Sequence, residues 1–102
     1  MQRDQRSWTF LSNHAHVLVC ISEESDIRIR HIALRVGITE RAASSIVADL
    51  EHDGYLTRVK KGRHNEYVVH GSQPLRHPVE QHHNIGELLQ LLQSRDAVRQ
   101  PD

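Results

Sequence analysis

A glycine-containing turn between two short amphipathic segments most constrains what this chain can fold into. Residues 30–36 carry apolar side chains spaced for one face of a helix, and Gly37 follows where a left-handed helix cap needs it. Thr39 is a suitable N-cap for a second helix, which we expect to end near His52. Two helices joined by a turn of this kind are typical of a helix-turn-helix.

The segments around this helix pair predict a complete order of elements. Residues 8–22 have helical periodicity, and residues 27–29 alternate as a short edge strand would. Residues 55–59 and 66–70 favour strands, and the glycine-containing segment 60–65 between them predicts a hairpin tip. The order predicts an α+β fold that is mostly α, a winged helix-turn-helix with a three-helix core, a short strand and a two-stranded wing.

A loop and one more helix are expected after the hairpin. Pro78 suits the first turn of this helix, whose apolar stripe is Val79, Ile85, Leu88, Leu89 and Leu92. The expected organisation is a flexible arm over 1–7, a winged domain over 8–70, a loop over 71–77, a C-terminal helix over 78–93 and a disordered tail over 94–102.

Charge is unevenly distributed along the chain, although the net charge is zero. Residues 28–65 hold eight basic and four acidic residues, a balance of +4, and the rest of the chain carries −4. The basic residues of this stretch are Arg28, Arg30, Arg35, Arg41, Arg58, Lys60, Lys61 and Arg63. A neutral protein with this polarity can present a positive face to phosphates.

The stretch IRIRHIALRVGITERAASSIVADLEHDGYLTRVKKGRHNEYVV resembles the winged helix-turn-helix core of small prokaryotic transcriptional regulators of the MarR-like and ArsR-like kind. The resemblance covers about residues 9–70 and is densest at Ile32-Ala33-x-x-Val36-Gly37-Ile38-Thr39 and Leu50-x-x-x-Gly54-Tyr55-Leu56. It implies that the helix after the turn enters the major groove of double-stranded DNA. It also implies that the hairpin wing contacts the backbone or the minor groove.

The helix from Thr39 supplies the first set of candidate DNA contacts. Its expected buried stripe is Ala43, Ile46, Val47 and Leu50, so other side chains near its start face outward. The candidates are Thr39, Arg41, Ala42, Ser44 and Ser45. Arg41 is the long donor among them and suits a guanine edge, although an exposed arginine is also a common solvated surface residue.

The wing and the start of the preceding helix supply the remaining candidates. In the wing they are Arg58, Lys60, Lys61, Arg63 and His64, with Arg63 suited to a narrow minor groove. The alternative is that this basic tip merely protects the edge of a soluble hairpin. Arg28 and Arg30 are candidates for phosphate contacts, with a solvated surface role equally open.

Nine histidines and one cysteine raise the question of a metal or redox site. No pair of histidines has metalloprotease spacing, and zinc-finger spacing is absent, so we predict no metal and no cofactor. A gathering of His77, His82 and His83 across a dimer is the less favoured alternative to surface or interface histidines. Cys20 lies on the apolar side of the first predicted helix, where a small core residue is expected. We find no nucleophile-base pair or phosphate-binding loop, so an enzyme is not expected.

Apolar residues at both ends of the domain predict a homodimer. The candidate interface residues are Trp8, Phe10, Leu11, Ile85, Leu88, Leu89 and Leu92. The longest apolar run, Val17–Ile21, is far too short to span a membrane, which takes about 20 residues. Residues 1–7 are polar and resemble no signal peptide, so a cytoplasmic location is expected.

These features support one leading function and one alternative. The leading hypothesis is a DNA-binding transcriptional regulator, with activation and repression equally open. The alternative is a winged-helix protein-interaction module in a larger assembly, because a fold alone does not fix a function. Nothing in the sequence identifies a small-molecule effector or the DNA sequence bound.

Overall fold

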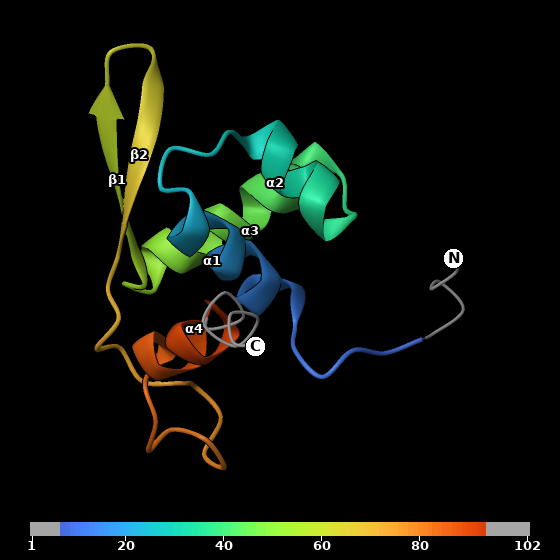
Figure 1. Ribbon diagram of the computed structural model, residues 1–102, viewed down its shortest axis with the longest axis vertical. Coiled ribbons are helices and arrows are strands. Elements are labelled where there is room, and N and C mark those ends of the chain that lie inside the picture. The colour runs from blue at the N-terminus through green and yellow to red at the C-terminus, as the bar shows by residue number, and fades with distance from the viewer. Residues whose placement is uncertain (1–6, 94–102) are drawn as a thin grey trace, which may run out of the picture.

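The computed structural model describes residues 7–93 and shows a small helical body from which a two-stranded hairpin projects (Figure 1). The elements are α1 (Asn13–Glu23), α2 (Ile29–Val36), α3 (Glu40–His52), β1 (Leu56–Lys61), β2 (His64–Val69) and α4 (Ile85–Gln93). The predicted fold class is confirmed, since a mostly helical winged-helix domain is followed by a C-terminal helix. The predicted tail over 94–102 and most of the predicted arm lie outside the described residues.

The helix-turn-helix forms as the sequence predicts. Gly37 adopts a φ of 83° and donates its N–H to the carbonyl of Ala33 at 2.8 Å, which ends α2. Thr39 caps α3, because its hydroxyl oxygen accepts the N–H of Ala42 at 3.0 Å. The predicted apolar stripe of α3 is buried in full: Ala43, Ile46, Val47 and Leu50. Local capping and helical periodicity therefore placed this pair of helices correctly.

The first helix begins later than its apolar pattern predicts. Residues 8–12 precede α1, and Ser12 is the N-cap, with its hydroxyl oxygen accepting the N–H of Ala15 at 3.3 Å. Phe10 is 92% exposed and stands in edge-to-face contact with Trp8. The prediction that helical periodicity starts at Trp8 was wrong, because the serine cap fixes the start of the helix locally.

The short strand predicted over residues 27–29 is not formed. Arg28 is instead the N-cap of α2, and within residues 7–93 the sheet consists of β1 and β2 alone. One hydrogen bond, from the Tyr67 N–H to the Ser25 carbonyl at 2.8 Å, joins this segment to the hairpin. The side chain of Ile27 is buried in the core, and this burial explains the apolar pattern that suggested a strand.

The wing is longer and its turn tighter than predicted. The strands pair antiparallel from Leu56 opposite Val69 to Lys61 opposite His64, which leaves Gly62 and Arg63 as a two-residue loop. Gly62 has a φ of 61°, the left-handed conformation that tight hairpin turns require. In Figure 1 the hairpin extends well beyond the helices on one side of the molecule.

The last helix is shorter than predicted, because Pro78 does not start it. Residues 76–84 form turns, and α4 begins at Ile85. A reciprocal cap sets this start: Asn84 Oδ1 accepts the Glu87 N–H at 2.9 Å, and Glu87 Oε1 accepts the Asn84 N–H at 2.8 Å. Val79, which was assigned to the apolar stripe, is exposed. The C-terminal helix of the predicted organisation is therefore 85–93 in the structure.

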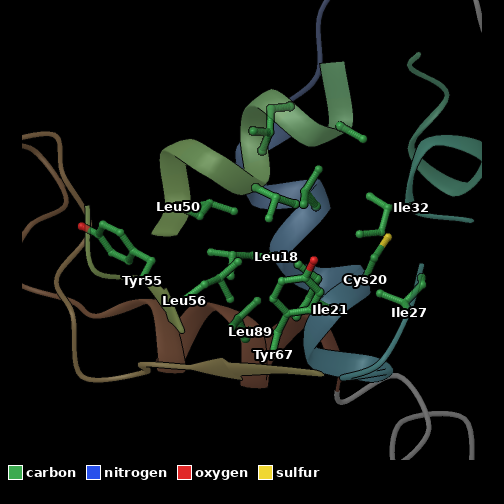
Figure 2. Packing of buried hydrophobic residues seen from close by; sticks show 14 of the residues in the cluster. Leu18, Cys20, Ile21, Ile27, Ile32, Leu50, Tyr55, Leu56, Tyr67 and Leu89 are labelled. Carbon is green, nitrogen blue, oxygen red and sulfur yellow. The ribbon is translucent and has the colours of Figure 1, made fainter. Parts of the chain in front are cut away.

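One hydrophobic core joins the helices to the base of the wing (Figure 2). Its largest fully buried side chains are Ile21, Ile32, Val17 and Val47. Tyr67 from β2 and Leu89 from α4 pack into the same cluster. Cys20 is buried here, and burial raises the pKa of its thiol, as expected of a core residue. Within the described residues, no helix has the length and apolar character needed to cross a membrane.

Candidate nucleic-acid interface

The start of α3 presents a compact polar surface. Arg41, Ser44 and Ser45 are exposed, whereas Ala42 is half-buried. Within residues 7–93 the guanidinium of Arg41 has no hydrogen-bond or ion-pair partner. The positive end of the helix dipole lies at the same place, and it favours an anionic ligand. This end of α3 can therefore receive a phosphate or the acceptor atoms of a base.

The hairpin carries its basic residues in two different states. Near the base of the wing, Arg58 donates to both carboxylate oxygens of Glu51, from Nε at 2.9 Å and from Nη2 at 2.6 Å. The hydrogen bonds from Glu51 raise the pKa of the Arg58 guanidinium. At the tip, Lys60 and Arg63 are exposed and make no ion pair with any residue of the described part. The tip is therefore open to a ligand, and the base is held to α3.

Two other wing candidates have intermediate surroundings. Lys61 lies 3.2 Å from a carboxylate oxygen of Glu66 on the opposite strand. Hydrogen bonding from Lys61 lowers the pKa of the Glu66 carboxyl. His64, directly opposite Lys61 in the hairpin, is exposed. Since both members of the Lys61–Glu66 pair are themselves well exposed, the pair is weak and can open when a stronger anion approaches.

Arg28 and Arg30 are exposed at the start of α2, and neither side chain has a partner among residues 7–93. Arg35, later in α2, donates to Glu23 of α1 at 2.7 Å. Three of the eight basic residues of segment 28–65 are thus paired in the structure. The other five are free at the starts of two helices and at the hairpin tip: Arg28, Arg30, Arg41, Lys60 and Arg63.

Sequence reasoning missed the pairing of the three acidic residues in the second half of α3. Asp49 lies 2.8 Å from His14 of α1, Glu51 is held by Arg58 of β1, and Asp53 accepts from Arg76 at 2.6 Å. Hydrogen bonding from Arg76 lowers the pKa of the Asp53 carboxyl. Each basic partner comes from a different part of the chain, so no helical spacing could have announced these pairs.

An apolar pocket of about 670 Å³ lies away from the free basic residues. Residues 10–12, the first turns of α1, the end of α3 and the start of α4 enclose it. The His14–Asp49 and Asp53–Arg76 pairs lie along its lining. The pocket therefore adjoins the end of α3 that is remote from Arg41.

The histidines of the C-terminal part have local partners. His77 accepts the N–H of Val79, and His83 lies 3.1 Å from Glu87 one helical turn ahead. The rings of His82 and His83 stack at a tilt, with centroids 4.4 Å apart. In the part of the chain that the structure describes, no three histidine, cysteine or acidic residues are arranged to hold a metal ion.

Solved structures with a similar fold are transcription regulators in two of three cases. The PcaV transcriptional regulator from Streptomyces coelicolor, solved with its natural ligand, has a TM-score of 0.54 and 22% identity over 86% of this chain and 67% of that chain. MepR, a regulator of the multidrug efflux pump MepA of Staphylococcus aureus, has a TM-score of 0.53 and 15% identity over 97% of this chain and 70% of that one. AF1382 from Archaeoglobus fulgidus has a TM-score of 0.54 and 14% identity over 99% and 100% of the two chains.

The comparison with curated protein sequences finds no match. The family model of the MarR family matches residues 12–63, from the cap of α1 to the tip of the wing. This match covers half of the chain and includes the helix-turn-helix and the strand that leads to the hairpin loop. The chain therefore belongs to the MarR family of winged-helix transcriptional regulators.

Proposed function

We propose that the protein regulates transcription by binding double-stranded DNA with the start of α3 in the major groove and the tip of the wing on the backbone or in the minor groove. One observation carries the proposal. The basic side chains left without a partner lie at the start of α2, the start of α3 and the hairpin tip. Free cations on a polarised surface favour a polyanion.

The chemistry of the α3 surface favours shallow reading of base sequence. Arg41 is the long free donor that can reach a guanine edge. Thr39, Ser44 and Ser45 have short side chains that permit close approach and can donate to phosphate oxygens, and Ala42 adds no donor. We expect most of the affinity to come from backbone contacts and a smaller part from base contacts.

The wing and α2 supply the proposed contacts outside the major groove. Lys60 and Arg63 extend the positive surface to the tip, with Lys61 and His64 beside them. Arg63, within the two-residue loop, is the side chain best placed to enter a narrow minor groove. Arg28 and Arg30 would hold phosphates beside the start of α2.

Binding to DNA fragments selected from genomic DNA, measured by fluorescence anisotropy at several salt concentrations, tests this function. We expect Arg41→Ala to weaken binding about tenfold and to flatten the preference among sequences. The double variant Lys60→Ala/Arg63→Ala should weaken all sequences similarly and reduce the dependence on salt by about two counterions.

Arg76→Ala is the matched control, because it removes one positive charge beside the pocket, far from the proposed contacts. Its DNA affinity should change little. Affinity that ignores salt, or a wing double variant that binds as well as wild type, would contradict the proposal. Complete absence of DNA binding would favour a protein-interaction module.

We also propose that two copies bind DNA together as a homodimer in the cytoplasm. Trp8 and Phe10 are strongly exposed beside the apolar pocket, and a second copy would cover them. Ile85 and Leu89, which were predicted to form the interface, are buried in the core of their own chain. The proposed interface therefore depends on Trp8, Phe10 and Leu11, with half-buried Leu88 and Leu92 at its margin.

A further inference from the structure

We propose that Glu51 and Arg58 are positioning residues for DNA binding: their ion pair fixes the wing at one angle to α3, so that both elements reach the same stretch of DNA. This inference rests on the proposed function and assigns Arg58, a candidate DNA contact on sequence grounds, to a different task. The pair joins the last turn of α3 to the third residue of β1.

The geometry of the pair suits a rigid brace. Arg58 donates two hydrogen bonds to the two oxygens of one carboxylate, at 2.9 Å and 2.6 Å. Two parallel bonds between planar groups restrict rotation as well as distance. The side chain of Glu51 is 25% exposed, much less than that of a typical surface acid. The pair therefore holds an orientation, which a single flexible contact would not do.

The connection between α3 and β1 needs such a brace only at this point. Backbone bonds from Tyr55 to Leu50 and from Gly54 to Glu51 close the end of the helix, and Leu56 is buried beyond it. After Leu56, every residue of β1 is exposed. Arg58 is thus where the projecting strand leaves the core, and its contact with Glu51 is the last one from β1 to α3 before the free tip.

A small rotation at the base of the wing has a large effect at its tip. Arg63 follows Arg58 by five residues, which corresponds to about 16 Å of extended strand. A rotation of about 10° at Arg58 would therefore displace the tip by about 3 Å, the length of a hydrogen bond. Loss of the pair would uncouple the contacts of the tip from those of Arg41.

Arg58 lies on the face of the hairpin that turns toward the helices. It is paired across the strands with Tyr67, which is buried, and it is two residues from buried Leu56. Side chains two apart on a strand, or directly opposite on its partner, share one face. A DNA contact from Arg58 would have to give up both bonds to Glu51.

Charge and geometry predict opposite results for one substitution. Glu51→Gln removes a negative charge and releases Arg58. If Arg58 contacted DNA directly, the variant would bind DNA more tightly. If Glu51 and Arg58 position the wing, the variant binds more weakly although the protein has become more positive. We expect affinity to fall about threefold to tenfold.

The experiment measures binding of the full chain to a selected DNA fragment by anisotropy, with urea unfolding to establish that each variant is folded. Glu40→Gln is the matched control, because it makes the same charge change on α3 at an acid that has no partner in the described residues. It should bind equally well or more tightly. The exchange Glu51→Arg/Arg58→Glu, which keeps the composition, should recover most of the lost affinity.

A double-mutant cycle separates positioning from a purely structural effect. In the wild type, Arg63→Ala should cost more affinity than it does in the Glu51→Gln background, because a loosened wing no longer delivers Arg63. Arg58→Lys, which keeps the charge but loses the paired bonds, supports the same conclusion by weakening binding, even if Glu51→Gln fails to fold. Tighter binding by Glu51→Gln, or an unchanged cost of Arg63→Ala, overturns this inference alone. A wild type that does not bind DNA overturns the proposed function as well.

Discussion

At the residue scale, partners distinguish side chains that look equivalent in the sequence. Arg41 and Arg58 both lie in the basic segment and both are exposed, yet one is free and the other donates twice to Glu51. A guanidinium already satisfied by a carboxylate must break those bonds before it can bind a phosphate. The candidate contacts Arg28, Arg30, Lys60 and Arg63 share the free state of Arg41.

Gly37 is the residue whose substitution tests the turn most directly. It adopts a φ of +83°, and an added Cβ would meet no atom within 4 Å, so strain in the backbone is the main cost of a side chain there. We expect Gly37→Ala to lower the free energy of unfolding by about 1 kcal/mol, because the left-handed conformation disfavours alanine. Gly37→Asn should cost less, since asparagine tolerates this conformation. Urea denaturation checks both, and equal stability of all three proteins would refute the argument.

At the element scale, the structure differs from expectation mainly at the starts of helices. The apolar pattern placed the start of α1 at Trp8 and the start of α4 at Pro78, but both helices begin at caps several residues later. The signal for α4 was present in the sequence, because Asn84 is followed three residues later by Glu87. Apolar residues before a cap pack elsewhere or remain exposed, so periodicity overstates the length of a helix.

The cap of α4 makes a prediction about pH. The hydrogen bond from the Asn84 N–H, with a further one from His83, holds the pKa of Glu87 below its ordinary value of 4.5. A lowered pKa in the folded state means that the carboxylate stabilises the fold fully above about pH 4.5 and loses this effect as pH falls through the lower value. Glu87→Gln should therefore lower the unfolding free energy at neutral pH, and by a smaller amount at about pH 3.

Urea denaturation at both pH values measures the difference. Glu80→Gln is the control, because the Glu80 carboxylate has no ion pair or side-chain hydrogen bond within residues 7–93. It should change stability equally at the two pH values. If Glu87→Gln also shows a difference independent of pH, the carboxylate does not stabilise α4 through this cap.

At the scale of the whole molecule, the surface has two functional sides. The free basic residues lie at the helix starts and on the wing, whereas the exposed aromatic residues and the apolar pocket lie beside α4. The recognition helix α3 connects them, with Arg41 near its start and Asp49 and Asp53 lining the pocket at its end. This arrangement leaves one side free for a second copy while the other side faces DNA.

The proposed homodimer can be tested by mass. Light scattering at micromolar concentration should give twice the mass of 11.8 kDa for the wild type. Phe10→Ser should shift the protein toward the monomer without lowering its stability, because Phe10 is 92% exposed and lies outside the core. Leu34→Ser, at another exposed apolar residue on α2, is the control and should leave the mass unchanged. A monomeric wild type would contradict the dimer.

The sequence by itself determined the elements whose signals are local. The Gly37 turn, the Thr39 cap and the stripe of α3 each depend on residues within one or two helical turns, and all three formed as predicted. Only the tertiary structure decided which charges are free, because the partners of the α3 acids are separated in sequence by 35 residues for His14, 7 for Arg58 and 23 for Arg76. Ion pairs over such separations form after the core has packed. Packing therefore decides which basic residues remain free for DNA.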